Sequence, residues 1–309
     1  MSEYHNPVLL EKSVRALITD PSGVYVDATF GGGGHSRRIL ESLGPDGRLL
    51  AFDRDADASA NIPEDKRFTL IHNNFRFVHN YVLLDAWQQA TRDFRGHSVD
   101  GILADLGVSS HQFDTAERGF SFRFDAPLDM RMNVESPLTA ASVVNEYPQE
   151  DLRRIFALYG ELAEADRLAR LVAAAREKEA IETTTALNAA LAPALPPFAE
   201  HKYLAKVYQA LRIEVNAEMR SLEKFLDGAA ASLKKGGRLV VITYHSLEDR
   251  MVKNFIKTGN VAGENEKDLY GNNLAPFVAV NRKPILPEEE EIAANTRARS
   301  AKLRIAEKV

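Results

Sequence analysis

Four consecutive glycines, Gly31 to Gly34, follow a short apolar run and one acidic residue in the segment YVDATFGGGGHS. The β-favouring run around Val24 predicts a strand that ends at Asp27, and the apolar spacing after the glycines predicts a helix. A bare turn between a strand and a helix lets a ligand lie directly against the backbone, beside the carboxylate of Asp27. The other residues of the turn restrict what that ligand is.

The glycines do not match the turns that bind phosphate groups. A dinucleotide needs G-x-G-x-x-G, but the last position holds Ser36 when counted from Gly31 and Arg37 when counted from Gly32. A P-loop needs Lys followed by Ser or Thr, and the turn has neither. S-adenosylmethionine carries no phosphate and still needs a bare turn for its methionine part. The turn therefore favours this methyl donor over the cofactor of an NAD-dependent oxidoreductase, which is the rival enzyme class.

Two further predicted strands also end in acidic residues. GRLLAFDRD ends at Asp53 and Asp55, and VDGILADLG ends at Asp105. Asp53 lies 22 residues beyond Gly31, about where a carboxylate accepts the two ribose hydroxyls of an adenosine ligand, and spacing alone does not decide between Asp53 and Asp55. Because ligands bind at the carboxyl ends of parallel strands, these acids together favour a methyltransferase over a ligand-free α/β domain whose glycines only form a tight turn.

Asp105 is the candidate catalytic residue. Suppose that the methyl acceptor is an exocyclic amine on a base. Such an amine is a poor nucleophile because its lone pair is delocalised into the ring. A carboxylate that accepts its N–H groups can turn the lone pair toward the methyl carbon and stabilise the positive charge that develops on nitrogen. The alternative, which is compatible with this role, is that Asp105 binds the amino acid part of the donor.

The order of predicted elements indicates an α/β fold. Apolar strands alternate with helical stretches up to the strand ending at Asp105, which is typical of a parallel, doubly covered sheet. From about residue 136 to 231 the pattern is almost wholly helical, and a strand pattern returns in GGRLVVITYHS. We expect a Rossmann-like methyltransferase sheet with an inserted all-helical domain. The expected boundaries are 1–112 and 213–309 for the methyltransferase domain, and 113–212 for the insertion, with a solvated loop at EEEE, residues 288–291.

The amino-acid composition excludes several kinds of binding site and one kind of methylation. The chain has 309 residues, of which 45% are hydrophobic, so it can bury a sizeable core. It has no cysteine, which excludes disulfides, thiolate zinc sites and iron–sulfur clusters, and also the thiolate nucleophile of cytosine C5 methylation. We expect no metal at the site. The sequence shows no membrane-spanning run and no signal peptide, so the expected location is the cytoplasm.

Eight segments resemble the bacterial 16S rRNA (cytosine-N4)-methyltransferase family. They occur in family order between residues 5 and 304, and PLDMRM and HSLEDR are far more specific than a glycine-rich turn. The resemblance implies direct in-line methyl transfer from S-adenosylmethionine, without a covalent enzyme intermediate, to the exocyclic N4 of a cytidine in the decoding centre of 16S rRNA. The full set is HNPVLLEKSV, DATFGGGGHS, DLGVSSHQFD, ERGFSF, PLDMRM, QALRIEVNAE, YHSLEDRMVK and RARSAKLR.

The same resemblance implies a set of site residues. It favours Asp53 over Asp55 as the ribose-binding acid and places Phe75 on the adenine side. The expected donor-binding residues are Gly33, Gly34, His35, Asp53, Phe75, Asp105 and Gln112. Many amino-methyltransferases have an Asp-Pro-Pro-aromatic signature at the end of the corresponding strand, and its aromatic ring stacks on the base. Here the sequence that begins at Asp105 is Asp-Leu-Gly-Val, so an aromatic residue from elsewhere in the chain must stack on the base. Tyr244 is the first candidate, followed by Phe113 and Phe120.

The remaining candidates concern RNA. Arg297 and Arg299 alternate with small residues and could grip phosphates from one exposed face. In HSLED, His245 is a candidate substrate contact, while a structural alternative is that Ser246 caps a helix whose first turn is acidic. The expected partner is 16S rRNA in the small ribosomal subunit, and a homodimer is left open. A non-enzyme alternative is an RNA-binding assembly factor with a vestigial donor site.

Overall fold

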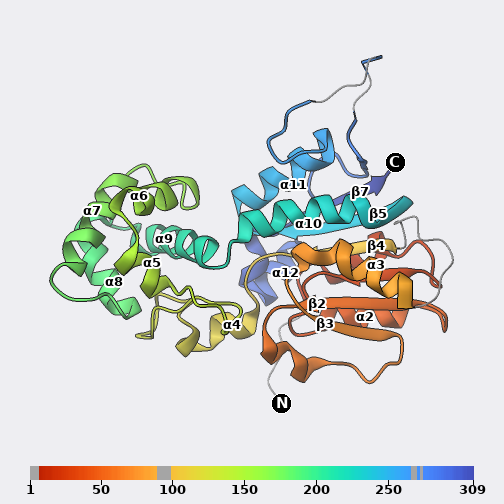
Figure 1. Cartoon of the computed structure of the whole chain (residues 1–309), viewed down its shortest axis with the longest axis horizontal. Helices are drawn as coiled ribbons and strands as arrows, with labels where there is room; N and C mark the ends of the chain where they lie inside the picture. The colour runs from red at the N-terminus through yellow and green to blue at the C-terminus, as the bar shows by residue number, and fades with distance from the viewer. Residues whose placement is uncertain (1–6, 89–98, 266–269, 272–273) are drawn as a thin grey trace. The chain divides into compact units, whose positions relative to one another are not determined.

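The computed structural model describes residues 7–88, 99–265, 270–271 and 274–309 (Figure 1). His5 and Asn6 of the first family-like segment lie outside these residues. The chain divides into two compact units, which we call the sheet unit (Met1–Gly107 with Met219–Val309) and the helical unit (Val108–Glu218). The domain boundaries expected from the sequence are 112/113 and 212/213. They stay a prediction, because they concern which segment of the chain folds by itself.

The sheet unit contains a seven-stranded sheet in the order β3-β2-β1-β4-β5-β7-β6. The first five strands in this order pair in parallel, and β7 pairs antiparallel with both β5 and β6. This arrangement confirms the predicted Rossmann-like α/β fold. The strands are β1 (Val24–Asp27), β2 (Arg48–Asp53), β3 (Phe68–His72), β4 (Val99–Asp105), β5 (Leu233–Thr243), β6 (Phe277–Ala279) and β7 (Lys302–Lys308).

Both faces of the sheet are covered, as the continuous apolar strands predict. Consecutive residues Tyr25 and Val26 of β1 are both fully buried, yet they belong to two different hydrophobic clusters. This follows from the two-residue period of a strand, which sends neighbours to opposite faces. The cluster that contains Val26 includes residues of α3 (Val78–Gln88), α10 (Glu218–Ser232) and α11 (Ser246–Thr258). The cluster that contains Tyr25 includes residues of α1 (Leu10–Leu17) and α2 (Gly34–Ser42).

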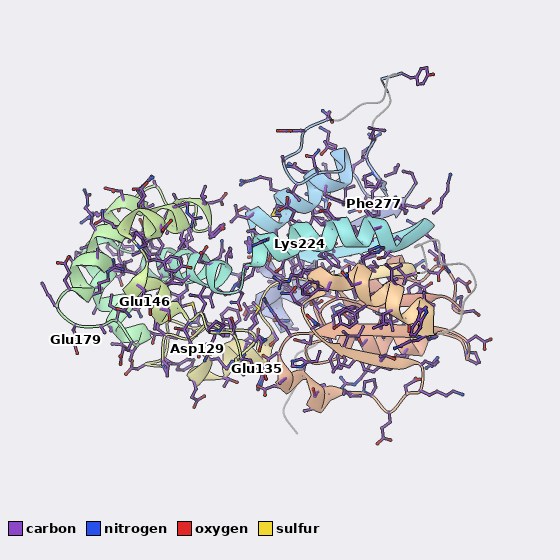
Figure 2. All side chains as sticks on the ribbon, in the orientation of Figure 1. Asp129, Glu135, Glu146, Glu179, Lys224 and Phe277 are labelled. Atoms are coloured by element: carbon purple, nitrogen blue, oxygen red, sulfur yellow. The ribbon has the colours of Figure 1, made fainter. Side chains whose placement is uncertain are left out.

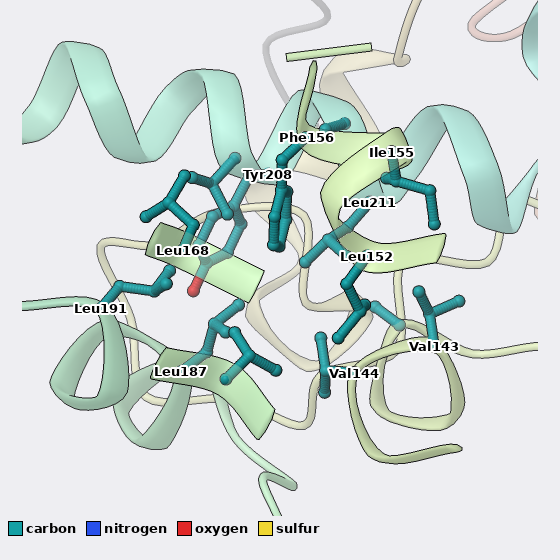
Figure 3. Packing of buried hydrophobic residues seen from close by; sticks show 14 of the residues in the cluster. Val143, Val144, Leu152, Ile155, Phe156, Leu168, Leu187, Leu191, Tyr208 and Leu211 are labelled. Carbon is teal, nitrogen blue, oxygen red and sulfur yellow. The ribbon is translucent and has the colours of Figure 1, made fainter. Parts of the chain in front are cut away.

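The helical unit has its own core (Figure 3). Leu152, Ile155 and Phe156 of α6 are fully buried in this core. Tyr208 and Leu211 of α9 point into the same cluster. The helices are α4 (Ser110–Asp114), α5 (Ala140–Glu146), α6 (Gln149–Leu158), α7 (Ala165–Arg176), α8 (Thr184–Leu191) and α9 (Glu200–Val215).

Two of the family-like segments meet inside the helical unit. The Asn216 side chain, just after α9, donates to the carbonyl of Met130 (2.7 Å) and accepts from the N–H of Met132 (2.8 Å). Met130 adopts a left-handed backbone (φ 61°), and Asp129, which is labelled in Figure 2, forms a two-point ion pair with Arg131. PLDMRM is therefore a tightly held turn, closed by an amide that belongs to RIEVNAE.

One expectation about the C-terminal part of the chain is wrong. The EEEE run forms the start of a helix, α12 (Glu289–Ala294), instead of a solvated loop. Two of its acids are bound by the N-terminal segment, since Glu291 accepts from the N–H of Leu9 (2.6 Å) and Glu288 pairs with Lys12 (2.7 Å). Over the described ranges, every helix is too short or too polar to cross a lipid bilayer.

Candidate active site

The carboxyl ends of three adjacent strands bring three acids to one edge of the sheet. Asp27 closes β1, Asp53 closes β2 and Asp105 closes β4, and β1 pairs in parallel with both of the others. Parallel pairing makes the strands end at the same edge, where open α/β sheets bind their ligands. The structure therefore brings together the acids that the sequence singled out.

Asp27 is built into the glycine turn. It is 1% exposed, its Oδ2 accepts from the Ser36 hydroxyl (2.7 Å) and its Oδ1 accepts from the N–H of Thr29 (3.1 Å). Burial raises the pKa of Asp27 to about 6, against the effect of these two hydrogen bonds. Sequence reasoning missed both Thr29 and Ser36, although each is a hydroxyl residue within or beside the turn.

Asp53 holds the same turn from the second strand. Its Oδ2 accepts from the N–H of Gly31 (2.7 Å) and its Oδ1 from the N–H of Asp55 (2.8 Å). Burial raises its pKa. Each carboxylate oxygen has a second lone pair, so Asp53 can still accept from a ligand hydroxyl. Asp55 is 6% exposed, and its side chain instead caps the next short helix by accepting from the N–H of Asp57.

Two glycines of the turn are required by its shape. Gly33 has a left-handed backbone (φ 76°) and caps the start of α2. A Cβ at Gly34 would collide with the ring of Pro7. The fit of the backbone thus explains these two positions.

His35 presents an unsatisfied polar atom. The side chain is 6% exposed, and its Nδ1 lies 3.7 Å from Oδ2 of Asp105, which is longer than a hydrogen bond. Burial lowers the pKa of His35 to about 4, so the ring is neutral at physiological pH. Its buried Nε2 has no hydrogen-bond partner among the residues that the structure describes. The Val8 backbone also acts on this ring through a hydrogen bond, so the fit of this edge to a polar cofactor rests on the strand-end acids and the bare turn beside it.

Asp105 is held from two sides. Its N–H donates to the Thr29 hydroxyl (2.7 Å), and its Oδ1 accepts from the Tyr244 hydroxyl (2.8 Å). The side chain is 23% exposed. Burial, together with repulsion from Asp27 and Glu248, raises the pKa of Asp105 to about 7, although the Tyr244 hydrogen bond lowers it. A carboxyl group that titrates near neutral pH at a ligand-binding edge is suited to exchanging protons with a ligand.

The other donor-binding candidates are more dispersed. Phe75 follows β3, is half-buried and makes an edge-to-face contact with Phe225 of α10 (ring centroids 5.2 Å apart). Gln112 belongs to the helical unit, where it is 5% exposed and forms a reciprocal capping box with Ser109 at the start of α4. Of the seven donor-binding candidates, the structure places six in the sheet unit and Gln112 in the helical unit.

The capping prediction for HSLED is wrong by one residue. His245, and not Ser246, is the N-cap of α11, and its side chain accepts from the N–H of Glu248. The Glu248 carboxylate reaches back to the backbone N–H groups of Tyr244 (2.8 Å) and His245 (3.3 Å). Sequence reasoning missed this role of Glu248. The signal was present, because an acid three residues after an N-cap is the mark of a capping box.

The two candidate phosphate-binding arginines lie on a short 3-10 helix, Thr296–Ser300. Ala298 between them is fully buried in the sheet unit, while Arg299 is exposed and Arg297 is half-buried. This geometry leaves Arg299 accessible to a large ligand.

Comparisons with known proteins identify the family of the chain. The model of the MraW methylase family matches residues 2–309. The chain belongs to the MraW methylase family. It is therefore a methyltransferase, as predicted, and S-adenosylmethionine is its methyl donor. The resemblance inferred from the sequence is confirmed.

Similar curated proteins cover nearly the whole chain. Ribosomal RNA small subunit methyltransferase H of Flavobacterium johnsoniae is 56% identical over 99% of this chain and 98% of its own length. The protein with the same name from Bacteroides fragilis is also 56% identical, over 99% of this chain and 97% of its own length. A solved rRNA methylase from Streptococcus thermophilus matches 97% of this chain and 93% of its own at 14% identity, with a TM-score of 0.37, which is too loose to carry an argument.

Proposed function

We propose that this methyltransferase transfers a methyl group to the exocyclic N4 of a cytidine in the decoding centre of 16S rRNA. The names of the relatives support small-subunit rRNA as the substrate. The observation that carries the choice of an amine is Asp105, which stands at the donor-binding edge with Oδ1 held by Tyr244. The absence of cysteine supports direct transfer, since attack by an amine needs no covalent nucleophile.

The residues at the edge can divide the work as follows. The bound donor supplies a methyl group that an amine nitrogen can attack directly, with a neutral thioether as the leaving group. Asp105 accepts an N–H of the amine at Oδ2, orients the nitrogen lone pair and takes up the proton that the amine loses. The neutral His35 ring and the glycine turn exclude water beside it, and the buried edge strengthens each charge interaction.

The remaining roles extend this proposal. Asp53 binds the ribose hydroxyls of the donor, Phe75 lies on its adenine side, and Gly33, Gly34 and His35 complete its site in the sheet unit, while a role for Gln112 stays a prediction from the resemblance. Arg297 and Arg299 contact the RNA, and the helical unit recognises the substrate, while the capping role of the His245 side chain favours the structural alternative for that residue. The target base must leave any pairing with guanine, because N4 is otherwise engaged in the helix. A substrate in the small ribosomal subunit agrees with the cytoplasmic location expected from the sequence.

The test compares two aspartates on one strand. Purified small subunits that lack the modification are incubated with S-adenosylmethionine and enzyme, and rRNA nucleosides are analysed by mass spectrometry. Wild-type protein should produce N4-methylcytidine, and Asp105→Asn should lower turnover about 10²- to 10⁴-fold. Asp100→Asn is the matched control, because Asp100 lies near the opposite end of β4 and pairs with Lys234. Its turnover should stay close to that of wild type.

Each alternative outcome has a meaning. An unchanged nucleoside profile with wild-type enzyme would overturn the proposed reaction. Near-normal turnover of Asp105→Asn would remove Asp105 from the chemistry. Isothermal titration of the same variant with S-adenosylmethionine separates catalysis from binding: a loss of donor affinity that accounts for all of the lost turnover would leave Asp105 as a donor-binding residue only.

A further inference from the structure

Tyr244 follows β5 and is tethered at both its backbone and its side chain. Its N–H donates to Oε2 of Glu248 (2.8 Å), within the capping box of α11, and its hydroxyl donates to Oδ1 of Asp105 (2.8 Å). The two residues are 139 positions apart in the chain, and parallel pairing of β4 with β5 brings them to the same edge. The capped helix start thus fixes the backbone from which the phenol reaches Asp105.

The ring of Tyr244 lies against the turn that follows Asp105. Gly107 has a φ of 97°, and a Cβ built on it would lie 3.3 Å from Cδ2 of Tyr244. A side chain at this position would be strained by its backbone and would crowd the ring. The turn after β4 therefore accommodates the phenol closely, and the hydroxyl is directed to one oxygen of the carboxylate.

The two oxygens of Asp105 are consequently not equivalent. Oδ1 is bound by Tyr244, whereas Oδ2 lies 3.7 Å from Nδ1 of His35, beyond hydrogen-bond distance. Most of the charged groups that act on this pair from the surrounding elements are acidic. They are Asp27 at the end of β1, Glu248 on α11 and Glu291 on α12, with the neutral ring of His35 on α2. An acidic environment favours the protonated form of Asp105, and a donated hydrogen bond favours the ionised form.

We propose that Tyr244 is a positioning residue for methyl transfer, whose hydroxyl favours the ionised form of Asp105 and leaves Oδ2 as the acceptor for the amine of the substrate. This inference rests on the proposed function of Asp105. It differs from the stacking role that the sequence suggested for Tyr244. A stacking platform needs only the ring, which phenylalanine also supplies, whereas the hydrogen bond to Asp105 needs the hydroxyl.

Tyr244→Phe tests the difference, because it keeps the ring and removes the hydroxyl. The rate of methylation of small subunits is measured as a function of pH under single-turnover conditions, with saturating S-adenosylmethionine. We expect the acidic limb of the profile to move up by about one pH unit, so that the rate near neutral pH falls by about 5- to 10-fold. The rate should recover toward wild type at alkaline pH, where Asp105 ionises without help.

The matched control is Tyr147→Phe. Tyr147 also donates its hydroxyl to a carboxylate, Oε1 of Glu214 (3.3 Å), but within the helical unit. Its loss should leave the pH profile unchanged. A wild-type rate and profile for Tyr244→Phe would overturn the inference and leave stacking as the role of the ring. A uniform loss of rate at every pH, with no shift of the acidic limb, would also overturn it.

A second measurement does not depend on turnover. The carboxyl carbon of Asp105 is followed by ¹³C NMR in a pH titration of the donor-free protein, for wild type and for Tyr244→Phe. The pKa of Asp105 should be higher in the variant, and an unchanged pKa would overturn the inference even if rRNA methylation itself fails. Wild-type protein that does not methylate small subunits would instead overturn the proposed function, and the titration would still decide whether the pair is coupled.

Discussion

Asp27 and Asp105 show, at the scale of single residues, how the sheet edge controls ionisation. The two carboxyl groups lie at the ends of adjacent parallel strands, and burial raises their pKa values to about 6 and about 7. Asp65 shows the opposite case, because hydrogen bonds from Arg67 lower its pKa to about 2. All three residues are aspartates, so their surroundings decide the pH at which each carboxyl group ionises.

These shifts predict how stability depends on pH without a bound donor. A carboxyl group whose pKa is raised by folding contributes stability below its unfolded pKa, and this contribution is lost as the pH rises through the folded value. For Asp105 the loss extends from about pH 4 to about pH 7. Within that window, wild type should lose about 1.4 kcal/mol per pH unit more than Asp105→Asn. Urea unfolding at several pH values measures this difference.

Asp65→Asn is the control with the opposite sign. Because the pKa of Asp65 is lowered, its contribution is present above about pH 4 and is lost as the pH falls toward 2. This variant should therefore differ from wild type in slope only at low pH. Parallel stability curves for wild type and Asp105→Asn between about pH 4 and 7 would contradict the assignment for Asp105.

At the scale of elements, the end of α9 and the PLDMRM turn depend on one amide. The Asn216 side chain is bonded to Met130, Met132 and the carbonyl of Arg212, and it is 8% exposed. Its removal would leave buried backbone groups without partners, and each such group costs roughly 1–3 kcal/mol. The helix end and the turn therefore hold each other in place.

Asn216→Ala should lower the free energy of unfolding of the protein by about 2–4 kcal/mol. The measurement is urea unfolding followed by far-UV circular dichroism. Asn133→Ala, in the same turn region, is the matched control, because its hydrogen bond to the N–H of Glu135 is exposed to solvent. That variant should change stability by less than about 1 kcal/mol. Equal effects of the two substitutions would show that the Asn216 contacts are not what stabilises the turn.

At the scale of the whole molecule, each unit has its own hydrophobic core. The cluster of the helical unit consists of residues between Phe120 and Val215, and the clusters of the sheet unit contain none of them. A separate core is the physical requirement for a domain that folds alone. We therefore expect the helical unit to be autonomous.

Two fragments test this expectation and the boundaries. Fragment 108–218 keeps the Ser109 cap, the Asn216 contacts and the two-point ion pair between Arg212 and Glu218, whereas fragment 113–212 loses all three. Both should be helical by circular dichroism, and 108–218 should be more stable in urea by about 2 kcal/mol or more. An unfolded 108–218 would contradict autonomy, and equal stability would favour the boundaries expected from the sequence.

The sequence by itself determined the elements and much of the chemistry. The alternating strands and helices gave the α/β fold, because the periods of apolar residues are local properties of the chain. The glycine turn excluded phosphate cofactors through the residues that it lacks, and strand-end positions identified Asp27, Asp53 and Asp105 as neighbours. The resemblance of the quoted segments led to the family that residues 2–309 match.

Only the tertiary structure decided how these residues are held. His245 replaced Ser246 as the helix cap, and the EEEE run became part of a helix bound to the N-terminal segment. The contacts of Tyr244 with Asp105 and of Asn216 with Met132 join residues 139 and 84 positions apart. No local pattern encodes such pairs, because they form where separate elements end side by side, and packing of the cores fixes which ends meet.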